Sequence, residues 1–191
     1  MQEIVFVTHN KGKIATAQKS MKNVKLSIFE YELDEPRSDD IAYISKMKVM
    51  EAYELVKKPC ISLDCGFWID ALNGFPKAFV NFALETVGLE GIIKLMEGET
   101  NRRCRFTECL SYYDGKELHQ FDGKHEGFIA PAILGLDTAE KWSDLWYIYI
   151  PYGYEKTLAQ MTKEEREARV LYESVDSMAE FAKWYEKREC V

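Results

Sequence analysis

A polar segment near the N-terminus has the residue types of an anion-binding turn. Thr8-His9-Asn10-Lys11-Gly12-Lys13 follows a short apolar run and opens a stretch with helical character. Free backbone N–H groups and the helix dipole favour an anion at such a position. Lys11 and Lys13 add positive charge, and Gly12 lets a ligand approach the backbone. The segment is not a Walker A loop. It predicts a phosphate-binding turn, with an ordinary strand-to-helix turn carrying surface lysines as the alternative.

A lysine interrupts the apolar stripe of the next predicted helix. This helix is expected from an N-cap at Ser38, with Asp39 and Asp40 in its first turn, to about Val56. Lys48 stands four residues from both Ile44 and Ala52, so it lies within the stripe that those residues share with Ile41 and Leu55. A lysine there either extends outward to solvent or is held for an anion.

A carboxylate ends a hydrophobic run in Leu63-Asp64-Cys65-Gly66. Charged residues rarely stand there unless they are paired, cap a turn or bind a metal. Four upstream acids could share a divalent cation with Asp64: Asp34, Glu35, Asp39 and Asp40. The alternatives are a turn-forming aspartate and a solvated acidic loop.

Other residues carry weaker signals. His119 and His125 lie on a predicted exposed strand and are interpreted as surface residues, whereas His9 borders the predicted phosphate turn. The aromatic residues of 142–154 could stack on a base, although core packing is the favoured interpretation. Thr162-Lys163-Glu164-Glu165 indicates a helix start with a capping box.

The elements that position these residues alternate as in an α/β protein. Strands are expected at 4–8, 24–29, 60–63, 67–72 and 145–150, and helices at 11–21, after 76 to about 87, and around 178–185. Asp114-Gly115 predicts a hairpin between 105–113 and 116–128. Gly88 is expected just after a helix C-terminus. The predicted architecture is one mixed sheet with helices on it.

The amino-acid composition limits the kinds of binding partner that are expected. The 191 residues carry 25 Lys and Arg against 32 Asp and Glu, a formal net charge of −7, so nucleic acid is not expected as the main partner. No apolar run reaches the roughly 18 residues of a membrane-spanning helix, and the N-terminus does not resemble a signal peptide. The five cysteines form no C-x-x-C pair, which favours reduced thiols in a cytoplasmic protein over a zinc site.

Taken together, these segments resemble the inosine triphosphate pyrophosphatase family. The resemblance rests on the 8–13 segment, Lys48 placed sixteen residues before Asp64, Ala71-Leu72-Asn73-Gly74-Phe75-Pro76, and the late helix start at 158–165. It covers nearly the whole chain in order. It implies a single domain, residues 1–191, in which a long mixed sheet with flanking helices forms two lobes around a nucleotide cleft. The family usually forms homodimers and cleaves ITP, dITP and XTP to the monophosphate and pyrophosphate with Mg²⁺.

The resemblance also implies roles for individual residues. Thr8, Asn10 and Lys13 would contact the triphosphate, with His9 and Lys48 beside them. Asp64 would hold the metal and orient or deprotonate the attacking water. Glu35 is the best match to the family's other metal-binding acid. Water attacking the α-phosphorus needs a positioned base, and the triphosphate needs cations to offset its developing charge.

The chain departs from the family pattern at three places. Leu63 stands where the family has the first of two acids, and Trp146 stands at the aspartate of its aromatic-Asp segment. Val170-Leu171-Tyr172 replaces the Ser-His-Arg that contacts the base. The residues that match the family's phosphate-binding side are therefore largely retained, whereas those that match its purine-binding side are replaced. Trp146 and Tyr172 are expected to contact the substrate on the purine side. Loss of a polar contact to the base lowers the discrimination between one base and another.

Two functional interpretations follow. The favoured one is a protein that binds non-standard purine nucleoside triphosphates with weak or lost hydrolysis. Some proteins similar to this family act in bacterial antiphage systems as sensors of a deoxyinosine nucleotide, beside an NAD-consuming effector. The alternative is an active pyrophosphatase with altered base specificity. A scaffold that keeps only the fold is a third, weaker possibility, since it has no need of Lys48 within an apolar stripe. The expected assembly is a homodimer or a complex with an effector protein.

Overall fold

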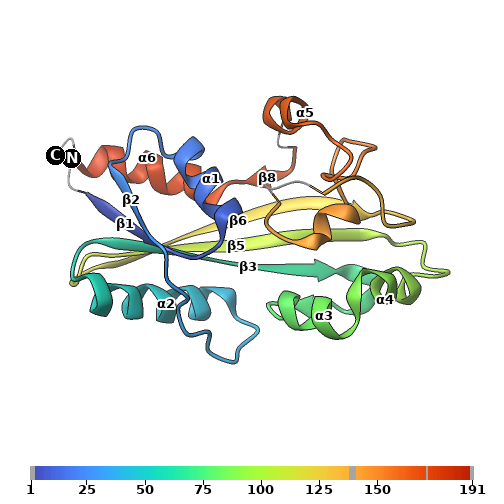
Figure 1. Cartoon of the computed structure of the whole chain (residues 1–191), viewed down its shortest axis with the longest axis horizontal. Helices are drawn as coiled ribbons and strands as arrows, with labels where there is room; N and C mark the ends of the chain where they lie inside the picture. Colours follow the sequence, from blue (N-terminus) through green and yellow to red (C-terminus); the bar gives the residue numbers. More distant parts are fainter. Residues whose placement is uncertain (1–2, 138–140, 171, 190–191) are drawn as a thin grey trace. The chain divides into compact units, whose positions relative to one another are not determined.

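The computed structural model describes residues 3–137, 141–170 and 172–189, and over this part of the chain it contains one eight-stranded sheet and six α-helices (Figure 1). The strands are β1 Ile4–Val7, β2 Leu26–Phe29, β3 Cys60–Ile69, β4 Pro76–Lys77, β5 Arg103–Tyr113, β6 Leu118–Ile129, β7 Tyr149–Pro151 and β8 Ser174–Val175. The helices are α1 Lys11–Ser20, α2 Ile41–Val56, α3 Val80–Thr86, α4 Gly88–Leu95, α5 Lys163–Ala168 and α6 Ser177–Glu189, with 3₁₀ segments η1 Asp70–Leu72 and η2 Asp144–Tyr147.

The sheet is mixed. Its order is β2-β1-β3-β5-β6-β7, with β4 paired to β3 and β8 paired to β6. Strand β1 runs parallel to β2 and β3, whereas β4 pairs antiparallel with β3 and β7 antiparallel with β6. The α/β class and the long mixed sheet predicted from the sequence are confirmed.

The chain divides into two compact units. The described residues of the first unit fall within Met1–Cys65, Glu108–Gly123 and Val175–Val191, and those of the second within Gly66–Thr107 and Lys124–Ser174. Strands β3, β5 and β6 contribute residues to both units.

In the first unit, helices pack on both faces of the strands. Helices α1 and α6 lie on one face, and α2 lies on the other (Figure 1). The α2 side is filled by an apolar cluster consisting of Val5, Val7, Leu33, Val49, Ala52 and Cys60. The predicted inward face of α6 is confirmed, because Met178, Phe181, Ala182 and Tyr185 are all buried. The hairpin at Asp114 is also confirmed, and its carboxylate accepts from the backbone of Lys116 and Glu117.

The second unit has its own core. Most of its buried members come from β3, α4, β5, β6, η2 and β7, and they include Phe67, Ile92, Cys104, Ile129, Leu145 and Tyr149. Helices α3 and α4 lie together on one face of its strands (Figure 1). Gly88 has a φ of 69° just after α3, as expected of a helix C-terminus. The chain then continues directly into α4, a helix that the sequence prediction missed.

Two element boundaries predicted from the sequence are wrong. The N-cap of α2 is Asp40 and not Ser38, because the Asp40 carboxylate accepts from the backbone of both Ala42 and Tyr43. Residues 60–69 form one strand and not two strands around a turn. Gly66 lies inside this strand, where an added Cβ would stand 2.4 Å from the Trp68 ring, so this glycine permits a close approach rather than a turn.

The strand predicted at 145–150 is only partly correct. The segment begins as the 3₁₀ turn η2, whose N-cap Ser143 accepts from the backbone N–H of Leu145, and becomes extended at Tyr149. The apolar run reflects burial of Leu145, Ile148 and Tyr149 in the core rather than a continuous strand.

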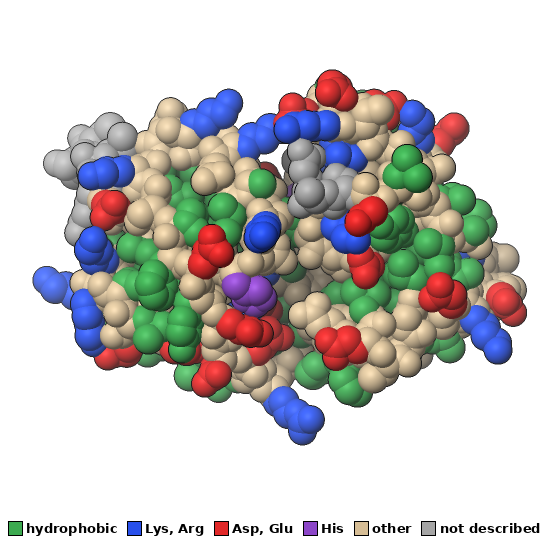
Figure 2. Space-filling model, viewed as in Figure 1, with side chains coloured by type: hydrophobic (Ala, Val, Ile, Leu, Met, Phe, Trp, Pro, Cys, Tyr) green, Lys and Arg blue, Asp and Glu red, His purple; other side chains and the backbone are tan. Residues whose placement is uncertain are grey.

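Charged side chains of both signs are intermixed on the face of the molecule shown in Figure 2, and no extended basic surface is visible there. None of the helices in the described residues is long and apolar enough to cross a membrane.

Candidate functional site

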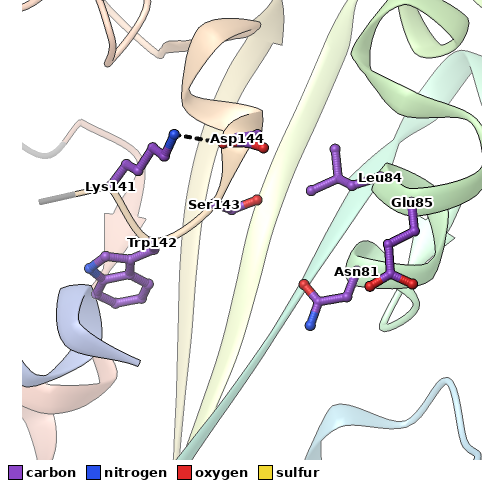
Figure 3. A pocket seen from close by; sticks show the side chains of 7 residues that line it. All are labelled: Asn81, Leu84, Glu85, Lys141, Trp142, Ser143 and Asp144. Atoms are coloured by element: carbon purple, nitrogen blue, oxygen red, sulfur yellow. Dashed lines mark ion pairs between the residues drawn. The ribbon is translucent and has the colours of Figure 1, made fainter. Parts of the chain in front are cut away.

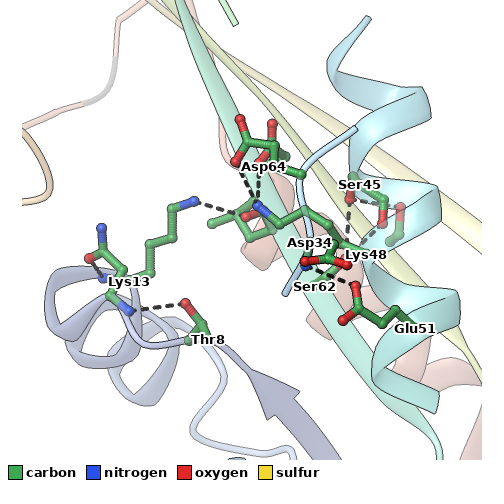
Figure 4. A network of polar contacts seen from close by, with 12 residues as sticks. Thr8, Lys13, Asp34, Ser45, Lys48, Glu51, Ser62 and Asp64 are labelled. Atoms are coloured by element: carbon green, nitrogen blue, oxygen red, sulfur yellow. Dashed lines mark hydrogen bonds and ion pairs between the residues drawn. The ribbon is translucent and has the colours of Figure 1, made fainter. Parts of the chain in front are cut away.

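The central feature of the first unit is an ammonium group held between two carboxylates. Lys48 Nζ donates to Asp64 Oδ1 at 3.0 Å and to Glu35 Oε2 at 3.1 Å (Figure 4). The side chains are 15% exposed for Lys48, 6% for Asp64 and 51% for Glu35. Lys48 is therefore paired with two carboxylates of the protein and does not extend freely into solvent.

Helix α2 and strand β3 position this pair. The buried face of α2 carries Ile44, Ser45, Val49 and Ala52, and Lys48 follows that face toward β3. Leu55, expected in the same stripe, is instead 46% exposed near the end of the helix. Burial disfavours the ammonium form, but the charges of Asp64 and Glu35 and their hydrogen bonds outweigh this and raise the pKa of Lys48 above its ordinary value.

A buried hydroxyl network fixes α2 against β3 one turn before Lys48. Ser62 Oγ donates to the backbone carbonyl of Ser45 at 2.8 Å, and Ser45 Oγ donates to Ser111 Oγ at 2.8 Å. All three serines are buried. Sequence reasoning missed them. The available signal was the position of Ser45, three residues before Lys48 and next to the apolar Ile44.

The predicted phosphate turn begins α1 on the other side of β3. Asn10 is the N-cap, and its side chain accepts from the backbone N–H of Lys13 at 3.0 Å, while Thr8 Oγ1 accepts from the backbone N–H of Asn10 at 3.2 Å. The Lys13 ammonium donates to the backbone carbonyl of Leu63 at 2.8 Å, next to Asp64. His9 is exposed. Figure 4 shows the side chains of Lys13 and Lys48 extending from α1 and α2 toward the same part of β3, where they contact Leu63 and Asp64.

The four upstream acids are not equivalent. Glu35 shares Lys48 with Asp64, whereas Asp40 caps α2. The backbone N–H of Asp34 donates to Glu51 Oε2 at 2.9 Å. Glu35 is therefore linked to Asp64 through the Lys48 ammonium that both carboxylates share.

The donor set at Lys48 fits one particular kind of metal. Within residues 3–137, 141–170 and 172–189 no three His, Cys, Asp or Glu residues form a cluster that could enclose a metal ion. Mg²⁺ does not require such a cage, since it is usually bound through one or two carboxylates together with substrate phosphates and water. Two carboxylates, of Glu35 and Asp64, that already share one cation match that requirement.

The residues expected on the purine side belong to the second unit. Trp146 packs against its core, with the guanidinium of Arg166 over the ring at 5.6 Å. Tyr172 is 50% exposed, and its ring lies near that of Tyr154 at 6.3 Å. Leu171, which falls at the expected base-contacting motif, lies outside the described residues.

The same unit contains a pocket of about 290 Å³ between α3 and the start of η2 (Figure 3). Its walls carry the side chains of Asn81, Leu84, Glu85, Lys141, Trp142, Ser143 and Asp144. Lys141 is fixed there by Asp144 at 2.9 Å. Trp142 thus lies at a cavity, whereas most other aromatics of 142–154 pack in or against the core.

Comparison with known proteins places these observations in a family context. Residues 4–171 match the Ham1 family. The dITP/XTP pyrophosphatase of Thermococcus kodakarensis is 31% identical over 188 residues, covering 95% of this chain and 96% of the relative. The dITP/XTP pyrophosphatase of Saccharolobus solfataricus is 34% identical over 170 residues, covering 86% of this chain and 84% of the relative.

Solved structures support the same fold. The Ham1 protein of Staphylococcus aureus matches with a TM-score of 0.78 at 22% identity, covering 98% of this chain and 100% of that one. A HAM1 protein from Coxiella burnetii matches with a TM-score of 0.79 at 17% identity and the same coverage. At these identities the likeness concerns the fold alone.

Proposed function

The chain belongs to the Ham1 family, and from that premise we propose that it binds non-standard purine nucleoside triphosphates such as dITP, ITP and XTP and hydrolyses them to the monophosphate and pyrophosphate. The family match confirms the resemblance to the inosine triphosphate pyrophosphatases. Relatives named dITP/XTP pyrophosphatase that align over almost their whole length support this choice of substrate class and reaction.

The observation that carries the proposal is the buried Asp64 carboxylate with Lys48 at 3.0 Å and the Lys13 ammonium at the adjacent carbonyl. An anionic group and two ammonium groups beside the middle of strand β3 form a site with both a base and phosphate-binding cations. A protein that needed only the fold would gain little from burying this charge, because apolar residues often replace buried ion pairs without loss of stability.

The proposed mechanism assigns one task to each side chain. Lys13, Lys48 and the N-terminal backbone of α1 bind the phosphate oxygens and offset their charge. Asp64 orients the water that attacks the α-phosphorus and accepts its proton, and pyrophosphate leaves. Glu35 and Asp64 would hold Mg²⁺. When bound, Mg²⁺ supplies positive charge that stabilises the negative charge of the phosphates in the transition state.

A second candidate function is nucleotide binding with slow turnover, as in a sensor coupled to an effector protein. It is favoured by the replacement of a family acid by Leu63, which is buried and apolar, and by Trp146 and Tyr172 on the purine side. With Leu63 the site has one acid fewer for the metal or for water activation. A homodimer is the expected assembly for the enzyme, and a complex with another protein for the sensor.

Calorimetry and pyrophosphate release, measured on the same samples, distinguish these functions. The purified chain is titrated with dITP, ITP, XTP, dATP and dGTP in the presence of Mg²⁺, and each sample is then assayed for pyrophosphate. The enzyme proposal expects rapid pyrophosphate release from at least one of dITP, ITP and XTP. Tight binding without pyrophosphate would support the sensor. Absence of binding to every nucleotide would contradict both functions.

A further inference from the structure

One side chain occupies the position between the two carboxylates proposed for the metal. The Lys48 ammonium donates to one oxygen of Asp64 and to one oxygen of Glu35, each at about 3 Å (Figure 4). A divalent cation bound to these carboxylates would need oxygens of the same groups. Because a second cation there would be repelled strongly at such a distance, Lys48 and the metal compete for the same carboxylates.

We propose that Lys48 is a resident counter-ion that a nucleotide must draw away before Glu35 and Asp64 can bind a divalent cation. The phosphates take the ammonium, and the released carboxylates become available to the metal. Nucleotide and metal then bind cooperatively, and the metal binds weakly when no nucleotide is present. This inference rests on the proposed function, because it takes Glu35 and Asp64 as the metal ligands.

The surroundings of Lys48 allow such a transfer. Lysine carries a compact charge on a flexible four-carbon stem, so the ammonium can move while the backbone stays in place. Helix α2 is held by its Asp40 cap and by the contact of Ser45 with Ser62. The Lys48 side chain retains 15% exposure, which gives a phosphate access to it. Moving from a carboxylate to a phosphate exchanges one anionic partner of the ammonium for another, and the metal would then replace Lys48 as the cation beside the buried Asp64 carboxylate.

Lys13 provides an internal comparison. Its ammonium also lies beside this part of β3, but its described partner is the neutral carbonyl oxygen of Leu63 at 2.8 Å. Lys13 forms no ion pair among the residues that the structure describes. A phosphate can therefore bind Lys13 without releasing a carboxylate. Loss of Lys13 should weaken nucleotide binding only, whereas loss of Lys48 should weaken nucleotide binding and strengthen metal binding.

The first test is metal binding in the absence of nucleotide. Mn²⁺ replaces Mg²⁺ as an EPR-visible probe, and free Mn²⁺ is measured for the wild type, Lys48→Met and the matched control Lys13→Met. We expect Lys48→Met to bind Mn²⁺ at least about fivefold more tightly than the wild type, the lower end of typical coupling between sites. Lys13→Met should match the wild type. Equal or weaker Mn²⁺ binding by Lys48→Met would overturn the inference.

A further variant separates this inference from the assignment of the metal ligands. Adding Asp64→Asn to Lys48→Met should abolish the gain in Mn²⁺ affinity. A gain that persists in the double variant would mean that the ion binds elsewhere, and the proposed metal site would fail together with the inference. Loss of Mn²⁺ binding in Asp64→Asn, combined with no gain in Lys48→Met, would retain the metal site and reject only the competition.

A measurement on the wild type covers the case in which Lys48→Met does not fold. Lysine side chains labelled with ¹⁵N are observed by NMR, with the Lys48 ammonium assigned through Lys48→Arg. The expected result is that dITP in the presence of EDTA shifts the Lys48 signal, whereas Mg²⁺ alone at the same concentration leaves it in place. A Lys48 signal that responds to Mg²⁺ alone and not to dITP would contradict the proposed order of release.

Discussion

Substitution of Asp64 by asparagine separates catalysis from binding at the proposed site. Asparagine keeps the size of the side chain and removes its charge and its capacity to accept a proton. A general base typically contributes about 10²–10⁴-fold to a rate, so pyrophosphate release by Asp64→Asn should fall at least about a hundredfold. In the absence of Mg²⁺, the Kd for dITP should stay unchanged or decrease, because one negative charge facing the phosphates is lost.

The structure also limits the loss of stability expected from Asp64→Asn. At 3.0 Å and an effective dielectric constant of about 20, attraction between the Lys48 and Asp64 charges is about 5 kcal/mol before desolvation is subtracted. Removing one partner of a buried pair costs about 3–5 kcal/mol when the other charge is left alone. Lys48 retains Glu35 at 3.1 Å, so the free energy of unfolding should fall by less than this.

The assay measures pyrophosphate release and dITP binding on the same preparations, with urea unfolding as the check on folding. Asp70→Asn is the matched control, because Asp70 is also paired, to Arg105 at 2.9 Å, but lies outside the proposed site. The control should keep wild-type rates. If Asp64→Asn retained more than about a tenth of the wild-type rate, Asp64 would not be the base, since loss of a general base costs more than that.

Three further predictions concern stability. Glu108→Gln should lower the free energy of unfolding by about 1.5–3 kcal/mol, because the buried carboxylate accepts hydrogen bonds from both N and Oγ of Ser177. The control Glu180→Gln, at an exposed ion pair, should change it by less than about 1 kcal/mol. Phe181→Ala should cost about 3–5 kcal/mol by emptying a fully buried ring position, as measured by urea unfolding. Burial raises the pKa of the thiols of Cys60, Cys65 and Cys109 to about 12. These thiols ionise at a lower pH in the unfolded state than in the folded state. Their contribution to stability should therefore be intact below about pH 8 and decline as the pH rises toward 12. Replacing the three cysteines by alanine should reduce that decline.

Local sequence signals predicted the elements whose defining contacts form between residues close together in the sequence. The Asp114 hairpin, the glycine that ends α3 and the capping box of Thr162 and Glu165 all depend on residues within a few positions of one another. Periodicity likewise identified the buried face of α6, because a regular helix maps sequence spacing directly onto direction.

The sequence failed where a distant residue decides the local structure. The sequence predicts two strands separated at Asp64 to Gly66, yet Asp64 lies within one continuous strand, where Lys48 is its partner. The hydroxyl contacts of Ser45 with Ser62 and Ser111 join three separate elements, and single-sequence patterns do not encode such contacts.

For the candidate site, the sequence likewise indicated individual residues but not the contacts between them. Lys48 was identified because its charge broke an apolar stripe, and Asp64 because its charge ended an apolar run. A separation of sixteen residues does not predict that the two side chains touch. The ion pair at 3.0 Å forms because α2 packs on β3. The choice of Glu35 among four acids came from the resemblance, and its contact with Lys48 supports that choice without testing its role.

The most direct test of the central claim is product analysis of dITP incubated with the wild-type chain and Mg²⁺ in water enriched in ¹⁸O. The account predicts dIMP and pyrophosphate in equal amounts, with the heavy oxygen in dIMP, because water attacks the α-phosphorus. Orthophosphate with dIDP, or heavy oxygen in pyrophosphate, would place the attack at another phosphorus and contradict the account. Unchanged dITP would contradict hydrolysis itself.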